Sequence, residues 1–277
     1  MIFYKTVTAG NDFIHIDMEE YESPGTTGVT KGHLAQRLCS RHTGAGADGV
    51  VYYKISRTTK SVDFEIFNRD GEEAELSGNG MAGCSALLFY LKKAFDRDHV
   101  ILNTKIGPKK NTCLLHEKNK FRLKVEIGTA DFQNRDFFPF LEEKKWDYKY
   151  NNITFYPVSV GNPHVVVPIK EDIPGERLEQ MGKMLESAAI FPYKTNVEFI
   201  LPTGENFRVF YYERGVGRTL SSSTGSAAVF AVLKKLNLVK DTLTIPFPGE
   251  NIKISGKNKI YIENSTEIVY KGVYLYT

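Results

Sequence analysis

Two short runs of small polar residues, each followed by an apolar segment, could bind an anion. They are Ser77-Gly78-Asn79-Gly80 and Ser222-Ser223-Thr224-Gly225. The first N–H groups of a helix lack partners within the helix, and that end carries about half a positive charge. Small residues there allow close approach of a carboxylate or phosphate. Taken alone, each run is better explained as an ordinary N-cap, which favours serine, asparagine and threonine.

The two runs belong to a longer internal repeat, which favours the binding interpretation. Residues 6–16 and 157–167 both consist of a β-rich run, the pair Gly-Asn (Gly10-Asn11 or Gly161-Asn162) and a second β-rich run. The serine-containing runs follow in the same order, so the chain reads as two duplicated halves. Matched motifs in homologous halves would direct both helix N-termini at one site between the halves. A Walker phosphate loop is excluded because its lysine and glycine spacing are absent.

The surrounding pattern predicts the elements that carry these runs. Residues 81–91 and 226–233 are apolar on every side, which predicts two buried helices surrounded by sheet. Residues 33–38 and 178–187 have the periodicity of amphipathic surface helices. Runs of β-branched and aromatic residues predict strands, as at 49–53, 207–212 and 259–262. The charged stretch Leu141–Asn152 reads as a solvated connection.

Composition sets the class of protein. The 277 residues include 36 Lys and Arg against 33 Asp and Glu, and 42% are hydrophobic. That balance excludes a disordered chain and a strongly basic nucleic-acid binder. Three scattered cysteines (Cys39, Cys84 and Cys113) do not form a disulfide framework or a zinc site. With no signal peptide or membrane-spanning run in the sequence, we expect a cytoplasmic protein with free thiols, and no nucleic-acid or membrane partner.

Several sequence blocks, in order, resemble the diaminopimelate epimerase family of pyridoxal-independent amino acid epimerases and racemases. The resemblance covers nearly the whole chain. Its blocks are Gly10–Phe13, Arg41–Gly49, Phe67–Gly71, Ser77–Gly80, Gly161–His164, Phe191-Pro192 with Thr195–Phe199, and Glu213–Gly217. The resemblance implies an α+β fold of two pseudo-symmetric domains, each a mostly antiparallel barrel-like sheet around a central helix. It places residues 1–121 plus 266–277 in the N-terminal half and 122–265 in the C-terminal half.

The resemblance also implies the chemistry: inversion of an amino acid at Cα, without metal, pyridoxal or other cofactor. Two acid/base groups must flank the carbon, and preorganised donors must hold the carboxylate of the carbanion-like transition state. The family's acid/base positions fall on Ser77 and Ser222. The residues that the resemblance assigns to substrate binding are Asn11, Asn68, Gly78, Asn79, Asn162, Asn196, Glu213, Arg214, Ser223 and Thr224.

A zwitterionic distal end of the substrate would need both acceptors and a cation. Glu213 and Arg214 beside several asparagine amides meet that requirement and point to diaminopimelate rather than a one-ended amino acid such as proline. The implied reaction is conversion of LL-diaminopimelate to the meso isomer, a lysine and peptidoglycan precursor. The competing interpretations are turn residues for each asparagine and an exposed surface pair for Glu213 and Arg214.

One departure from the family affects the chemistry directly. The family has cysteine at both acid/base positions, whereas this chain has Ser77 and Ser222. A thiol titrates near 8.5, a serine hydroxyl is far less acidic, and each pKa unit corresponds to about 1.4 kcal/mol. Cys84 lies about two helical turns beyond Ser77, so we interpret it as a core residue instead of a replacement base.

Three accounts of the double serine remain open. The serines could be engineered replacements that disable a normal epimerase, although the serine-rich surroundings of Ser222 favour a natural variant. In a natural variant, His42 and His164 are the first candidates for auxiliary acid/base groups, against the alternative of structural histidines. Otherwise the chain is a non-catalytic binder of diaminopimelate-like amino acids, or a lyase or other isomerase on the same fold. The implied partners are a small amino acid substrate and a second copy of the chain in a homodimer.

Overall fold

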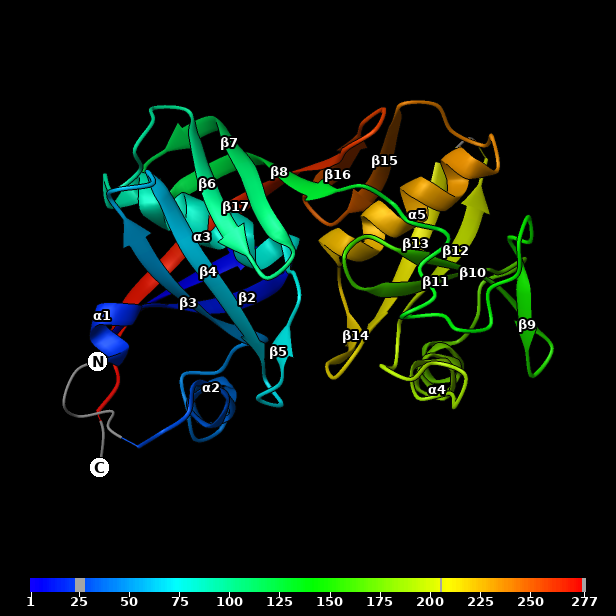
Figure 1. The fold of residues 1–277 in the computed structure, drawn as a ribbon, viewed down its shortest axis with the longest axis horizontal. Coiled ribbons are helices and arrows are strands. Elements are labelled where there is room, and N and C mark those ends of the chain that lie inside the picture. Colours follow the sequence, from blue (N-terminus) through cyan, green and yellow to red (C-terminus); the bar gives the residue numbers. More distant parts are fainter. Residues whose placement is uncertain (23–27, 205, 276–277) are drawn as a thin grey trace. The chain divides into compact units, whose positions relative to one another are not determined.

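The computed structural model describes residues 1–22, 28–204 and 206–275, and the chain divides into two compact units (Figure 1). Unit 1 comprises Met1–Glu126 together with Glu263–Thr277, and unit 2 comprises Ile127–Ile262. The chain leaves unit 1 within strand β8 (Lys120–Gly128) and returns to it within β17 (Ile260–Val273). The C-terminal segment therefore belongs to the same unit as the N-terminal half.

Unit 1 contains a closed barrel. Besides β8 and β17, its strands are β1 (Ile2–Thr8), β2 (Asn11–Asp17), β3 (Gly49–Ser56), β4 (Ser61–Asn68), β6 (His99–Thr104) and β7 (Gly107–Glu117). Their order is β1-β2-β3-β4-β6-β7-β8-β17, and β1 also pairs with β17. Pairs β2–β3 and β4–β6 are parallel, whereas β1–β2, β3–β4, β6–β7 and β7–β8 are antiparallel. The short β5 (Glu73–Ala74) pairs with β4.

Helix α3 (Gly78–Tyr90) is the central helix of unit 1. It packs against β1, β2, β3 and β7, and its residues from Gly78 to Leu88 are buried. The apolar sequence correctly predicted burial over residues 81–88, whereas Tyr90, inside the predicted segment, is exposed. Cys84 is fully enclosed, as expected for a core residue, and burial raises the pKa of its thiol.

A second apolar layer covers the other face of strands β2 and β3. Helix α2 (Lys31–Cys39) contributes Leu34 and Leu38 to this layer, where they pack with Ile14 and Tyr52, and the short α1 (Met18–Tyr21) lies beside it. Successive residues of a strand point to opposite faces. Strand β3 is therefore buried on both faces, which explains its unbroken apolar start.

Unit 2 repeats this plan with a six-stranded sheet among the described residues. Its order is β14 (Gly217–Thr219), β13 (Asn206–Glu213), β12 (Asn196–Thr203), β11 (Pro163–Pro168), β10 (Ile153–Ser159) and β9 (Tyr148–Tyr150). Helix α5 (Ser223–Lys235) packs against β10, β11 and β12, and also against the hairpin of β15 (Thr242–Phe247) and β16 (Glu250–Ser255). The predicted α+β class, with a sheet packed around a central helix in each half, is confirmed.

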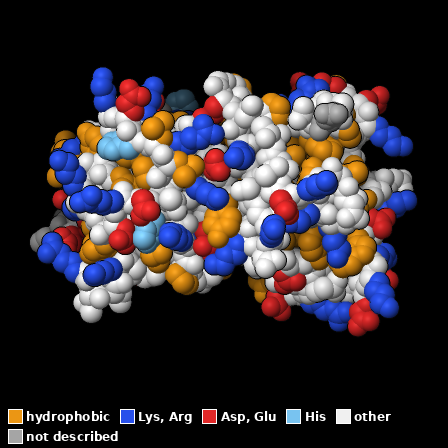
Figure 2. All heavy atoms as spheres, turned by 90° about the horizontal axis from the view of Figure 1, so that it is seen from above, with side chains coloured by type: hydrophobic (Ala, Val, Ile, Leu, Met, Phe, Trp, Pro, Cys, Tyr) orange, Lys and Arg blue, Asp and Glu red, His pale blue; other side chains and the backbone are white. Residues whose placement is uncertain are grey.

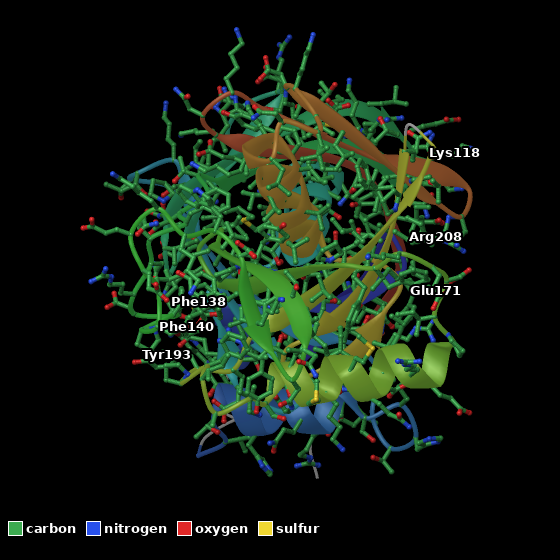
Figure 3. All side chains as sticks on the ribbon, turned by 90° about the vertical axis from the view of Figure 1, so that its right-hand side faces the viewer. Lys118, Phe138, Phe140, Glu171, Tyr193 and Arg208 are labelled. Atoms are coloured by element: carbon green, nitrogen blue, oxygen red, sulfur yellow. The ribbon has the colours of Figure 1, made fainter. Side chains whose placement is uncertain are left out.

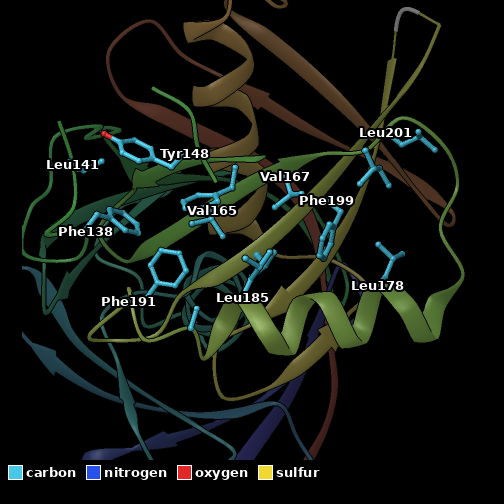
Figure 4. Close-up of a cluster of buried hydrophobic side chains, with 14 residues drawn as sticks. Phe138, Leu141, Tyr148, Val165, Val167, Leu178, Leu185, Phe191, Phe199 and Leu201 are labelled. Carbon is cyan, nitrogen blue, oxygen red and sulfur yellow. The ribbon is translucent and has the colours of Figure 1, made fainter. Parts of the chain in front are cut away.

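The surface helix of unit 2, α4 (Gly175–Glu186), covers an aromatic-rich core (Figure 4). Within it, Phe138 and Phe140 lie beside one another with ring centroids 6.1 Å apart (Figure 3). The prediction of a merely solvated connection over Leu141–Asn152 was wrong. Leu141 and Tyr148 are both buried in this core, because apolar side chains spaced among the charges anchor the segment to the sheet.

The duplication extends to strand register. In unit 1, parallel strands pair Phe13 with Gly49, and antiparallel strands pair Val51 with Ile66. At the corresponding positions of unit 2, His164 pairs with Asn196, and Glu198 pairs with Tyr211. Helices α3 and α5 both have 13 residues. The two units therefore present matched positions around their central helices.

Charged side chains of both signs are interspersed over the face shown in Figure 2, in keeping with the formal net charge of +3. Among the described residues, no helix is long and apolar enough to cross a membrane.

The packing of α3 against β1 and β2 requires glycine at position 83. A Cβ there would press against Thr6 Oγ1 and would lie 2.7 Å from His15 Nε2. We expect Gly83→Ala to lower the free energy of unfolding by about 1–3 kcal/mol, although alanine favours a helix by about 1 kcal/mol. Urea unfolding measures the change.

Gly175→Ala provides a matched control in another helix. Its added Cβ would meet only the end of the Arg218 side chain, which can move. We expect a change within about 0.5 kcal/mol. Equal stability of the Gly83→Ala protein and the wild type would contradict the packing account.

Candidate active site

Each central helix begins at one of the two predicted acid/base residues. Ser77 is the N-cap of α3, where its Oγ accepts the Gly80 N–H at 3.1 Å. Ser222 is the N-cap of α5, where its Oγ accepts the Gly225 N–H at the same distance, and the Thr224 hydroxyl lies 3.4 Å away. Both hydroxyl oxygens therefore lie at the positive end of a helix.

The glycine three residues after each cap is required by packing. A Cβ on Gly80 would lie 2.9 Å from Ile66 Cδ1, and one on Gly225 would lie 2.6 Å from Glu198 Oε1. Each helix therefore begins closely packed against its sheet. The other backbone N–H groups at the start of the two helices are those of Gly78, Asn79, Ser223 and Thr224, which the sequence assigned to substrate binding.

In unit 1, a directional chain of amides lies beside this helix start. Asn264 donates to Asn79 Oδ1 at 3.0 Å, and Asn79 donates to Asn11 Oδ1 at 2.8 Å. Asn11 in turn donates to Asp48 Oδ2 at 3.3 Å. Because an ionised carboxylate only accepts hydrogen bonds, Asp48 fixes the direction of the whole chain. This network joins two of the predicted binding residues, Asn11 and Asn79, through partners that sequence reasoning missed.

Four charged side chains brace the turn that holds Asn11. Lys5 Nζ lies 2.7 Å from Asp12 Oδ2 and also donates to the Gly46 carbonyl. Arg41 bridges Asp12 and Asp48 at 2.8 Å each. Burial alone would raise the pKa of the Asp12 carboxyl, but hydrogen bonds from Arg41 and Lys5 outweigh it and lower that pKa to about 2.

The Asp48 carboxyl has the opposite shift. Burial and the neighbouring charge of Asp12 raise the pKa of Asp48. The cluster therefore contains one strongly stabilised carboxylate and one that resists ionisation more than usual.

In unit 2, the predicted asparagines are fixed differently. Asn196 donates to the Pro163 carbonyl at 2.8 Å and accepts the Arg214 backbone N–H at 3.0 Å. It therefore ties β11 to the turn that follows β13. Asn162 accepts from His164 Nε2 at 3.0 Å, and His164 Nδ1 lies 2.8 Å from Glu198 Oε1.

The remaining predicted residues occupy turns. Glu213 and Arg214 lie at the hairpin turn between β13 and β14, where Arg214 Nη1 donates to the Tyr193 carbonyl at 3.1 Å. Asn68 ends β4, and its backbone makes the turn hydrogen bonds with Gly71 and Glu72.

The two candidate histidines differ in environment. His42 is exposed in the loop after α2, and no hydrogen bond or ion pair to it is found in the described part of the chain. His164 is completely buried. Neither imidazole contacts the Oγ of Ser77 or Ser222 among the described residues.

Residues that the sequence analysis did not assign also shape both sites. Asp48 and Glu198 stood inside blocks that were recognised as similar to the family, but their roles depend on contacts distant in sequence. Asn264 lies on β17, where buried residues alternate with less buried ones from Ile260 to Ile268. A polar residue on such an apolar face was the available signal.

Over residues 1–22, 28–204 and 206–275, no group of three or more His, Cys, Asp and Glu side chains is arranged to hold a metal ion.

Comparison with known proteins gives a consistent family. The family model for diaminopimelate epimerase matches residues 3–133 and 156–274. A diaminopimelate epimerase from Carboxydothermus hydrogenoformans is 31% identical over 283 residues, covering 99% of each chain. One from Methanothermobacter thermautotrophicus is 27% identical over 286 residues, also covering 99% of each.

Solved structures share the fold at low identity. A probable proline racemase from Agrobacterium radiobacter matches with a TM-score of 0.70 and 15% identity, covering 99% of this chain and 92% of that one. A hydroxyproline epimerase from Agrobacterium vitis matches with a TM-score of 0.70 and 14% identity, covering 98% of this chain and 90% of that one. At these identities the likeness concerns the fold alone.

The lowered pKa of Asp12 predicts how its contribution to stability varies with pH. The ionised carboxylate stabilises the fold above its unfolded value of 3.8, and that contribution is lost as the pH falls towards about 2. Asp12→Asn should therefore lower the free energy of unfolding at pH 7 and should have little effect near pH 2. Urea unfolding of the wild type and of the Asp12→Asn variant across this pH range measures the difference.

Asp136, an exposed carboxyl, supplies the control substitution Asp136→Asn, which should leave the pH profile unchanged. If Asp12→Asn lowers the free energy of unfolding as much near pH 2 as at pH 7, the lowered pKa of Asp12 is contradicted.

Proposed function

The chain belongs to the diaminopimelate epimerase family, and we propose that it binds diaminopimelate and inverts one α-carbon, converting the LL isomer to the meso isomer. The observation that carries this proposal is the matched pair of helix caps. Ser77 and Ser222 occupy equivalent positions in two duplicated units, each with its Oγ 3.1 Å from a first-turn N–H. The family's two acid/base groups fall on these residues.

Backbone donors at both helix starts are suited to the developing charge. Removing the proton from Cα places negative charge on the adjacent carboxylate, which becomes enolate-like. Donors that are already oriented stabilise that charge without reorganisation in the transition state. The location of Gly78, Asn79, Ser223 and Thr224 in the first turns of α3 and α5 supports this role for their N–H groups.

The acid/base step is where this chain differs from its relatives. One hydroxyl has to accept the Cα proton as an alkoxide while the other donates a proton to the opposite face. Among the described residues, the contacts of these two oxygens are backbone N–H groups and, for Ser222, the Thr224 hydroxyl. These described contacts include no side-chain base that could assist deprotonation, so we expect turnover well below that of a thiol pair.

The rest of the proposed site provides recognition. The distal amino acid end of diaminopimelate carries an ammonium and a carboxylate. Glu213 and the Arg214 guanidinium offer an acceptor and a cation for these groups. The Asn196 side chain holds the backbone of Arg214 at 3.0 Å and so supports this turn.

A second candidate function is binding without catalysis. The absence of a side-chain base at either hydroxyl within the described contacts favours it. In this case the pocket would hold a diaminopimelate-like amino acid without exchanging its Cα proton.

Restoring the thiols tests the proposal. The wild type and the Ser77→Cys/Ser222→Cys double variant are incubated with LL-diaminopimelate, and the stereoisomers are separated by chromatography. We expect slow formation of the meso isomer by the wild type, and an increase in kcat of roughly 100-fold or more in the double variant, because acid/base groups typically contribute that much. KM should change little, since the binding residues are untouched.

Ser221→Cys is the matched control, because Ser221 is buried beside Ser222 but does not cap the helix. It should leave kcat unchanged. Calorimetry separates the two candidates: binding by the wild type with turnover only in the double-Cys variant supports the non-catalytic binder. If the double-Cys variant neither binds nor converts diaminopimelate, the substrate assignment is wrong.

A further inference from the structure

Unit 2 contains a buried ionisable pair at positions where unit 1 has apolar side chains. His164 and Glu198 are both completely enclosed, with His164 Nδ1 2.8 Å from Glu198 Oε1. The second ring nitrogen of His164 contacts Asn162 Oδ1 at 3.0 Å. The pair therefore connects the core of unit 2 to a residue of the proposed substrate site.

The fold does not require polar residues at these positions. The register-matched residues of unit 1 are Phe13 and Val51, both apolar. Placing an ionisable pair in a core carries a desolvation cost, and well-packed apolar side chains are often at least as stable. A role beyond folding is therefore the better explanation for His164 and Glu198.

The hydrogen-bond geometry indicates what that role is. Asn162 presents its carbonyl oxygen to the ring, so His164 Nε2 must carry a proton. The other contact, between Nδ1 and the Glu198 carboxyl, holds one proton that either atom can carry. Glu198 Oε2 has no partner among the described residues, which leaves the imidazole as the side-chain contact of this carboxyl.

Because the side-chain oxygen of Asn162 faces the imidazole ring, its NH₂ group points away from the ring. Asn162 is 6% exposed, and in the described part of the chain this nitrogen has no hydrogen-bond partner. Its counterpart Asn11 is oriented by Asn79 and Asp48 instead. The two units thus orient equivalent asparagines by different means.

We propose that His164 and Glu198 are positioning residues for Asn162: Glu198 holds the ring through the proton that it shares with Nδ1, and the ring, which also carries a proton on Nε2, fixes the Asn162 amide as an N–H donor toward a substrate carboxylate. This rests on the proposed function for the identity of the ligand. If the ring instead carried its proton on Nδ1 alone, Asn162 would rotate to donate to Nε2. The Asn162 amide would then present its carbonyl oxygen to the substrate carboxylate, and the two groups would repel each other.

The orientation can be measured without ligand. Nitrogen-15 NMR of the histidine-labelled protein at neutral pH distinguishes protonated from unprotonated ring nitrogens, and His164→Phe identifies the signals of His164. We expect Nε2 of His164 to be protonated. An unprotonated Nε2 would overturn the proposal, whatever the substrate.

Exchange of the pair for the residues of unit 1 tests its effect on binding. The double variant His164→Phe/Glu198→Val should fold, with a melting temperature at or above that of the wild type. Calorimetry should show a Kd for diaminopimelate about tenfold or more above the wild-type value, because the amide is no longer held. His164→Phe alone should be less stable than the double variant, since it leaves Glu198 buried without its partner.

Tyr211→Phe is the control: it removes a hydroxyl bonded to Ser226 on the strand beside Glu198 while leaving the pair intact. It should leave the Kd unchanged. An unchanged Kd in the folded double variant, when Asn162→Ala weakens binding, would overturn the proposal. If the wild type itself does not bind diaminopimelate, the proposed function fails, and the NMR measurement still decides the orientation.

Discussion

The N–H groups at the start of a buried helix need partners, and in both units a serine hydroxyl supplies one of them. Ser77 and Ser222 each accept the N–H three residues on, and the glycine at that position lets the helix start pack closely against its sheet. The same arrangement leaves backbone donors and a positive helix end for an anionic ligand. Structural capping and the proposed catalysis therefore make competing demands on the same two oxygens.

A thiolate at such a cap is readily formed, whereas a serine has to become an alkoxide. The helix end and the capping N–H groups stabilise that anion, but the described contacts offer no side-chain base to either oxygen. The side chains proposed to bind the substrate have better-defined hydrogen bonds than the two hydroxyls proposed for acid/base chemistry. Asn11 is held by Asp48 in unit 1, and Asn162 is held by the His164–Glu198 pair in unit 2.

The sequence was sufficient for the features that depend on local pattern. Uniformly apolar segments predicted α3 and α5, and the small polar residues before them predicted their caps. Contacts between distant segments were not predictable in this way. Asn264 reaches Asn79 only because β17 returns to close the barrel, and the contact of Glu198 with His164 depends on strand register. His42 lies in a recognised block but is exposed, since a loop motif does not determine the direction of each side chain.

Exchange of the substrate Cα proton in D₂O tests most directly whether two serine hydroxyls can perform the family's chemistry. The wild-type protein is incubated with LL-diaminopimelate, and deuterium at Cα is followed by NMR and mass spectrometry in the separated isomers. The two-base account predicts slow deuterium incorporation, found in the inverted meso product before the recovered LL substrate. If diaminopimelate binds but keeps the protons on both of its α-carbons, the two-base account is contradicted.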